Sequence, residues 1–188
     1  MRRIVISCLV LLVSAVTAQA GKEFRLKSQL LMQDPGIAAA MEQITANPQD
    51  AIAWESLGKA LAAHGAYEDA EAAFEHGIDI DAKDPDLWVD LGAVRLRNEK
   101  FSAGLSAFRK AIDIEPFHAL ARYNVGVAEQ ALGHYEEALK AFEDALLLDP
   151  NLGDPAKNPG AANNPDLPFV KLRVYLRTTG AAPALMTP

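Results

Sequence analysis

The chain has 188 residues, of which half are apolar and 34 are alanine, and its 25 acidic residues outnumber the 18 basic ones. A net charge of −7 and a single cysteine argue against a basic nucleic-acid-binding protein and a disulfide-stapled miniprotein, and the apolar content argues against wholesale disorder. Aromatic residues make up only 7% of the chain. With so much alanine, this composition favours closely packed helices over a β-sandwich.

The first 20 residues have the three parts of a secretory signal peptide. Arg2 and Arg3 give a cationic start, residues 4–16 form an apolar run, and Ala18-Gln19-Ala20 has the small-x-small form that a signal peptidase accepts. The alternative, a transmembrane anchor, is disfavoured because a membrane-spanning helix needs about 20 apolar residues. We therefore expect cleavage near Ala20 and a periplasmic or secreted protein.

The only cysteine, Cys8, lies inside this apolar run and has no lipidation context. A mature chain starting at Gly21 contains no cysteine, so it forms no disulfide, thiolate nucleophile or cysteine metal site. Loss of the two leader arginines makes its net charge −9.

Residues 21–50 are expected to form a degenerate, helical N-terminal cap, and an internal repeat follows it. At an offset of 34 residues, glycines and phenylalanines coincide in three segments. The glycine column is Gly58, Gly92 and Gly126, and the phenylalanine column is Phe74, Phe108 and Phe142. Each unit contains two stretches with apolar residues at helical spacing, separated by turn residues. We expect helix hairpins at 51–84, 85–118 and 119–152, packed closely at the small residues.

These motifs resemble the tetratricopeptide repeat (TPR) of exported bacterial proteins. The resemblance rests on Trp54-x-x-Leu57-Gly58, Trp88-x-x-Leu91-Gly92, Ala70-x-x-x-Phe74, Ala138-x-x-x-Phe142 and the closing Pro116 and Pro150. It implies an all-α fold, a right-handed α-solenoid of three antiparallel helix hairpins with helical caps. Arg122, Gly104 and Ala82 stand where the family pattern has tryptophan, alanine and proline.

The C-terminal flank divides into three parts. Residues 153–165 are rich in proline and asparagine and are expected to be a linker. Residues 166–179 are expected to form a capping helix that begins near Asp166 and Pro168, although residues 170–174 alternate like a strand. Residues 180–188 are expected to be a loose tail. The flank leans basic through Lys171, Arg173 and Arg177, which either contact the acidic repeats or form a solvated face.

The sequence contains no catalytic constellation. The four histidines include no i, i+4 pair, and His64 and His134 are expected to be solvated turn residues. The acidic pairs Glu68-Asp69 and Glu136-Glu137 open second helices, where carboxylates face the helix dipole favourably. We therefore expect no enzyme, no metal and no cofactor. Residues 51–150 carry 9 basic and 19 acidic residues, which disfavours nucleic acid.

The resemblance implies that the first helix of each repeat lines a concave groove that receives a peptide or a partner helix. Glu55 and Val89 stand where carboxylate-clamping members of the family carry basic residues, so that activity is not expected. The alternative is that the groove positions pack against the terminal caps. The implied groove residues are Ile52, Glu55, Lys59, Asp86, Val89, Ala93, Arg97, Leu120, Tyr123, Val127 and Gln130.

The sequence thus favours a non-enzymatic periplasmic adaptor or scaffold that binds a protein or peptide partner in the cell envelope. It predicts no nucleic-acid partner and no stable membrane insertion after signal cleavage. The alternative is a structural module that self-associates, for example as a homodimer, through its end face or tail. An enzyme is the least favoured of the three readings.

Overall fold

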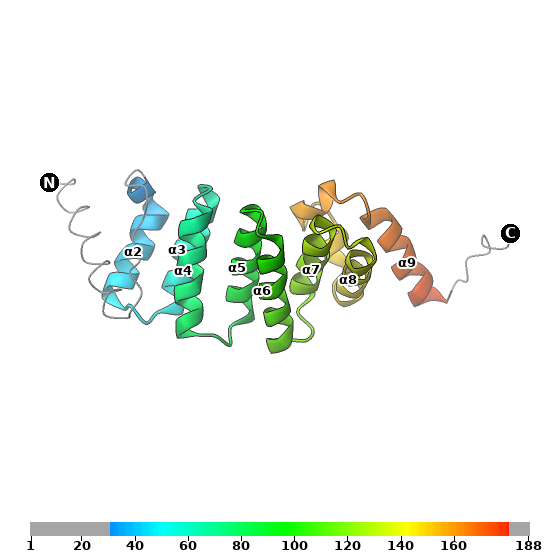
Figure 1. The fold of residues 1–188 in the computed structure, drawn as a ribbon, viewed down its shortest axis with the longest axis horizontal. Coiled ribbons are helices and arrows are strands. Elements are labelled where there is room, and N and C mark those ends of the chain that lie inside the picture. Colours follow the sequence, from blue (N-terminus) through cyan, green and yellow to red (C-terminus); the bar gives the residue numbers. More distant parts are fainter. Residues whose placement is uncertain (1–30, 181–188) are drawn as a thin grey trace. The chain divides into compact units, whose positions relative to one another are not determined.

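The computed structural model describes residues 31–180, and every regular element among them is a helix (Figure 1). The predicted all-α fold of antiparallel helix hairpins is confirmed. The predicted signal peptide, residues 21–30 of the N-terminal cap and the tail from residue 181 lie outside the described residues. The elements are η1 (Leu31–Gln33), α2 (Pro35–Ala46), α3 (Ala51–Ala63), α4 (Tyr67–Ile80), α5 (Pro85–Arg97), α6 (Phe101–Ile114), α7 (Ala119–Ala131), α8 (Tyr135–Leu148), η2 (Pro150–Gly153), η3 (Pro159–Asn163) and α9 (Leu167–Thr179).

The described chain divides into two compact units, which we call the first unit (residues 31–100) and the second unit (residues 101–180). In the first unit, α2 packs on α3, α3 on α4, and α4 on α5. In the second unit, α6 packs on α7, α7 on α8, and α8 on α9. Each unit is therefore a short stack in which sequence neighbours are also neighbours in space.

The helix ends follow from local chemistry. Asp50 caps α3 by accepting hydrogen bonds from the backbone N–H groups of Ile52 and Ala53, and Asp84 caps α5 before Pro85 in the same way. Two glycines with positive φ, Gly65 (73°) and Gly133 (83°), follow the C-caps of α3 and α7. Glycine adopts this left-handed conformation without a steric penalty, so it ends the first helix of these two hairpins. In the middle hairpin, Glu99 (φ 58°) occupies this place after the C-cap of α5.

The glycine and phenylalanine columns of the repeat meet inside the hairpins. A Cβ atom on Gly58 would lie 2.6 Å from Cε1 of Phe74, and one on Gly126 would lie 2.6 Å from Cε1 of Phe142. Both phenylalanine rings are fully buried. The absent side chain thus lets each ring pack directly against the backbone of the facing helix.

Charged pairs join helices of neighbouring repeats, and their sign reverses between the two units. In the first unit, Arg95 of α5 donates to Glu75 of α4 at 2.9 Å. In the second unit, Arg109 of α6 donates to Glu129 of α7 at 2.8 Å. Each pair spans 20 residues and occupies the same two places of the 34-residue repeat, with the cation and the carboxylate exchanged.

The C-terminal flank folds back onto the third repeat. Residues 166–179, whose pattern allowed a helix or a strand, contain the helix α9, and the preceding linker contains η2 and η3. Leu167 and Val170 of α9 share one buried cluster with Tyr123 and Phe142. Arg173 and Arg177 lie 2.9 and 3.4 Å from the Glu143 carboxylate of α8. These two basic residues therefore contact the acidic repeats within the same chain.

Candidate functional site

A pocket of about 470 Å³ opens between α3 and α5 in the first unit. Ligand pockets typically measure roughly 300–1,000 Å³. Its walls are largely alanine, valine and aromatic carbon, with a few charged groups at the edge. The lining residues are Lys59, Ala62, Ala63, Gly65, Tyr67, Phe74, Asp90, Ala93, Val94 and Arg97.

Lys59 is held between two carboxylates at one end of this pocket. Its Nζ donates to Glu55, one turn earlier on α3, and lies 3.3 Å from Oδ2 of Asp90 on α5. No described residue gives that buried Asp90 oxygen a hydrogen bond of normal geometry. Burial lowers the pKa of Lys59, but Glu55 and Asp90 outweigh this effect and bring it above its usual value.

Asp90, the acidic residue in the wall of the pocket, has a pKa well above its usual value. Burial raises its pKa to about 6, although the nearby Lys59 charge opposes the shift. Its carboxylate is therefore ionised at neutral pH and protonated in mildly acidic solution. The net charge of the pocket therefore changes between neutral and mildly acidic pH.

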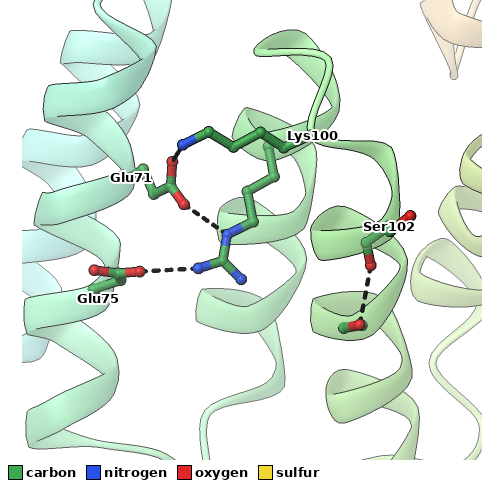
Figure 2. Close-up of polar contacts among 6 residues, drawn as sticks. Glu71, Glu75, Lys100 and Ser102 are labelled. Carbon is green, nitrogen blue, oxygen red and sulfur yellow. Dashed lines mark hydrogen bonds and ion pairs between the residues drawn. The ribbon is translucent and has the colours of Figure 1, made fainter.

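Two arginines of α5 differ in what they contact. Arg95 pairs with Glu71 at 2.8 Å and with Glu75 at 2.9 Å, and Lys100 also binds Glu71 (Figure 2). Burial raises the pKa of Glu71, but the bonds from Lys100 and Arg95 outweigh it and hold the pKa below its usual value. Arg97 lines the pocket and is exposed, and no residue within 31–180 forms an ion pair with it.

The predicted groove residues of the first unit separate into three groups. Lys59, Ala93 and Arg97 line the pocket, and Glu55 reaches its edge through the bond to Lys59. Ile52 and Asp86 are exposed outside it, whereas Val89 is buried. The first unit thus brings together four of the seven residues predicted there.

The second unit covers most of its predicted groove residues with its own C-terminal flank. Tyr123 is only 2% exposed and lies in the cluster with α9, and Val127 packs against this cluster. Gln130 donates to Asp166 at 2.6 Å. Leu120 remains exposed. Packing against a terminal cap therefore describes Tyr123, Val127 and Gln130, because the segment that includes Asp166 and α9 lies over them.

The contact between Tyr123 and this flank leaves polar groups unsatisfied. Asn158 and Asn164 lie beside the Tyr123 hydroxyl, where burial raises the pKa of that hydroxyl. Among the described residues, neither the hydroxyl nor Nδ2 of Asn164 has a hydrogen bond of normal geometry, and both atoms are buried. The cover over Tyr123 is thus made mainly by apolar packing.

Sequence reasoning missed several pocket residues, above all Asp90, Tyr67 and Phe74. A signal for Asp90 was present, because its column in the repeat is polar in all three units: Ser56, Asp90 and Asn124. A polar column beside apolar ones on the first helix marks positions that face the open side. Tyr67 and Phe74 belong to columns that the repeat pattern assigns to the core.

All four histidines contact other residues, and His64 and His134, which were predicted to be solvated turn residues, lie at the turns with side chains that are 42% and 57% exposed. Nε2 of His64 lies 3.0 Å from Asp34, which caps α2, and Nδ1 of His134 lies 2.8 Å from the buried Glu129. His118 caps α7, and His76 stacks on Trp54 with ring centroids 4.5 Å apart. In the described part of the chain, no group of three or more His, Cys, Asp or Glu side chains is arranged to hold a metal ion.

Models of the tetratricopeptide repeat match residues 36–85 and residues 119–152. The chain therefore contains tetratricopeptide repeats. A peroxisomal targeting signal receptor of Candida albicans (strain SC5314 / ATCC MYA-2876) is 35% identical over 82 residues. The match covers 43% of this chain but only 14% of the receptor. The similarity thus extends over a small part of that much longer protein.

Solved structures show the same fold. The crystal structure of MamA has a TM-score of 0.59 at 18% identity, covering 77% of this chain and 89% of MamA. The second TPR domain of Spaghetti (RPAP3), bound to the HSP90 peptide SRMEEVD, has a TM-score of 0.52 at 28% identity and covers 55% of this chain and 96% of that domain. Within residues 31–180, no helix has the length and apolar character required to cross a membrane.

Proposed function

We propose that the protein is a non-enzymatic adaptor that holds a segment of a partner protein in the pocket between α3 and α5. The observation that carries this proposal is the pocket itself, an open space with apolar walls and charged edges on the face where the family binds its ligands. The solved complex of a related repeat domain with a peptide supports a protein partner. Proteins built from these repeats are generally adaptors, which supports the absence of an enzymatic role.

The proposed place of action is the periplasm or the exterior, with a partner in the cell envelope. This part of the proposal rests on the leader pattern of residues 1–20, which lie outside the described residues. The binding surface is assigned to the first unit because the corresponding positions of the third repeat are covered by residues of the C-terminal flank. Tyr123 and Val127 are thus not proposed to contact the partner.

A photo-crosslinking experiment tests the proposal. Tyr67, a half-buried aromatic residue at the pocket, is replaced by benzoylphenylalanine in the full-length protein, and crosslinked segments are mapped by mass spectrometry. We expect one partner segment that disappears when Ala93→Glu fills the pocket. Tyr135 occupies the same place in the third repeat and is the control position, which should not capture that segment. Crosslinks from Tyr67 that persist in Ala93→Glu contradict the proposal.

The second candidate function is self-association through α9. Phe169, Leu172 and Tyr175 recur at helical spacing on its outer face and are 52, 52 and 58% exposed. Residues 167–180 contain three basic and no acidic residues, whereas residues 31–100 contain 5 basic and 14 acidic ones. A second copy of the chain therefore offers the opposite charge to this helix.

Light scattering distinguishes this candidate from the adaptor. Self-association predicts a dimer or larger species that Leu172→Glu converts to a monomer. A wild-type protein that stays monomeric at high micromolar concentration eliminates self-association and leaves the adaptor proposal intact.

A further inference from the structure

The charges around the pocket specify the kind of segment that it takes, an inference that rests on the proposed function. We propose that the bound segment carries one basic and one acidic side chain about 10 Å apart, with the basic group at Asp90 and the acidic group at Arg97. Small or apolar residues lie between these two charges. We call the Asp90 side of the pocket its acidic end and the Arg97 side its basic end.

The acidic end requires a hydrogen-bond donor. Glu55 and Asp90 share the single ammonium group of Lys59, so one negative charge of this trio is not compensated. Oδ2 of Asp90 is buried and accepts no hydrogen bond of normal geometry from any described residue. A guanidinium or ammonium group of a partner supplies both the missing donor and the missing charge.

The basic end requires an acceptor. The first unit contains five basic residues, and three of them, Lys59, Arg95 and Lys100, are paired with carboxylates. Arg97 faces the pocket with no ion pair among residues 31–180, although the first unit is rich in carboxylates. The contrast with Arg95, whose guanidinium reaches Glu71 and Glu75, shows how an arginine of this helix is otherwise satisfied (Figure 2).

Helix geometry gives the distance between the two ends. Asp90 and Arg97 are seven residues apart on α5, which corresponds to a rise of roughly 10 Å and places them on one face of the helix. An extended segment in the polyproline II conformation covers this distance in about three residues and returns its side chains to the same face, and a helical segment covers it in about seven. Ala93 and Val94 form the wall between the charges, so the intervening side chains meet an apolar surface.

The test measures binding of the full-length protein to fluorescein-labelled synthetic peptides. One set contains Arg-Ala-Ala-Glu and Glu-Ala-Ala-Arg, which cover both directions of an extended chain. The matched sets contain two arginines, two glutamates or two alanines at the same places. A helical set carries the same charge combinations seven residues apart. We expect one bipolar peptide to bind about tenfold or more tightly than every like-charged or uncharged peptide of its own set, an advantage that high salt reduces.

Charge reversal in the protein makes the assignment specific. Arg97→Glu should move the preference from the bipolar peptide to the corresponding peptide with two arginines. Lys83→Glu makes the same change in net charge at an exposed site outside the pocket, and it should leave the preference unchanged.

The outcomes separate this inference from the proposed function. Binding that is lost in Ala93→Glu but shows no preference for bipolar peptides, or no switch in Arg97→Glu, overturns the inference and leaves the adaptor function standing. If no peptide binds in a way that Ala93→Glu abolishes and the Tyr67 crosslink is also absent, both are overturned.

Discussion

The guanidinium of Arg122 donates two hydrogen bonds to the carbonyl oxygen of Pro116, from Nη2 at 2.7 Å and from Nε at 3.2 Å. Trp54 and Trp88 occupy the same place in the earlier repeats, and their indole N–H groups donate to the carbonyls of Pro48 and Ala82 at 3.0 Å. In each case the acceptor lies six residues earlier in the chain. Arginine thus departs from the repeat pattern but preserves the bond that fixes the turn before the helix.

Arg122→Met should destabilise the second unit by about 1 kcal/mol, because it keeps much of the side-chain length and removes the donors. Arg122→Trp should lose less, since it restores the donor that the other two repeats use. Urea unfolding monitored by circular dichroism gives both values. Equal stabilities of Arg122→Met and the wild type would show that the bond to Pro116 contributes nothing.

Alanine at Gly58 or Gly126 should destabilise the protein by roughly 1–3 kcal/mol, because the new methyl group overlaps the ring of Phe74 or Phe142. Ser56→Ala, at an exposed site of the same helix as Gly58, is the control and should be neutral or slightly stabilising. Thermal unfolding measures these changes. A Gly58→Ala variant as stable as Ser56→Ala would mean that the ring moves aside without cost.

Asp90 should make the first unit less stable as the pH rises. Its pKa of about 6 in the folded state lies above the usual 3.8, so the folded state binds more protons between these values. The stability contributed by this group therefore falls from about pH 4 to about pH 6 and then stays constant. Relative to the wild type, Asp90→Asn should gain on the order of 2 kcal/mol between pH 4 and pH 7.

Fluorescence of Trp54 and Trp88, both in the first unit, reports this unfolding in urea. Glu42→Gln removes an exposed carboxylate of the same unit and should show no such gain. A parallel pH dependence of Asp90→Asn and the wild type would contradict an elevated pKa at Asp90.

The C-terminal flank should be required for the stability of the third repeat. Val170 is fully buried in the cluster with Tyr123 and Phe142, so Val170→Asp should destabilise the second unit by roughly 3 kcal/mol or more. Leu172→Asp, two residues later on the exposed face of α9, should have a small effect. Hydrogen exchange of α7 and α8 amides measures both. Unchanged protection in Val170→Asp would mean that α9 does not stabilise the repeat.

The helices could be predicted because the repeat pattern records contacts that recur. Gly58 and Phe74 touch, and so do Gly126 and Phe142, so a fixed offset in the sequence reports a fixed contact in space. The pattern of residues 170–174 carried no such repetition. The sequence therefore allowed both a helix and a strand for these residues. In the structure they belong to the helix α9, which buries Val170 on one face.

The groove was harder to predict because it depends on segments outside the repeats. Val89 and Tyr123 are apolar or aromatic members of the predicted groove, and both are buried. For Tyr123, the cover comes from the C-terminal flank, including Leu167 and Val170 of α9, which lies outside the periodic repeats. An apolar residue at a groove position thus indicates burial as readily as it indicates binding. The polar column that contains Asp90 was the better guide to the open surface.

The reversed signs of the Glu75–Arg95 and Arg109–Glu129 pairs have a consequence for assembly of the chain. Repeats of similar shape are able to stack in the wrong order, and shape alone does not tell α5 from α7. If α4 met α7 in place of α5, Glu75 would face Glu129, whose carboxylate is almost fully buried. Two like charges would then meet at the new interface, and Arg95 would lose both of its partners on α4, Glu71 and Glu75. The charges on these helices therefore favour the native order of packing and disfavour a stack in which α4 meets α7 while the protein folds.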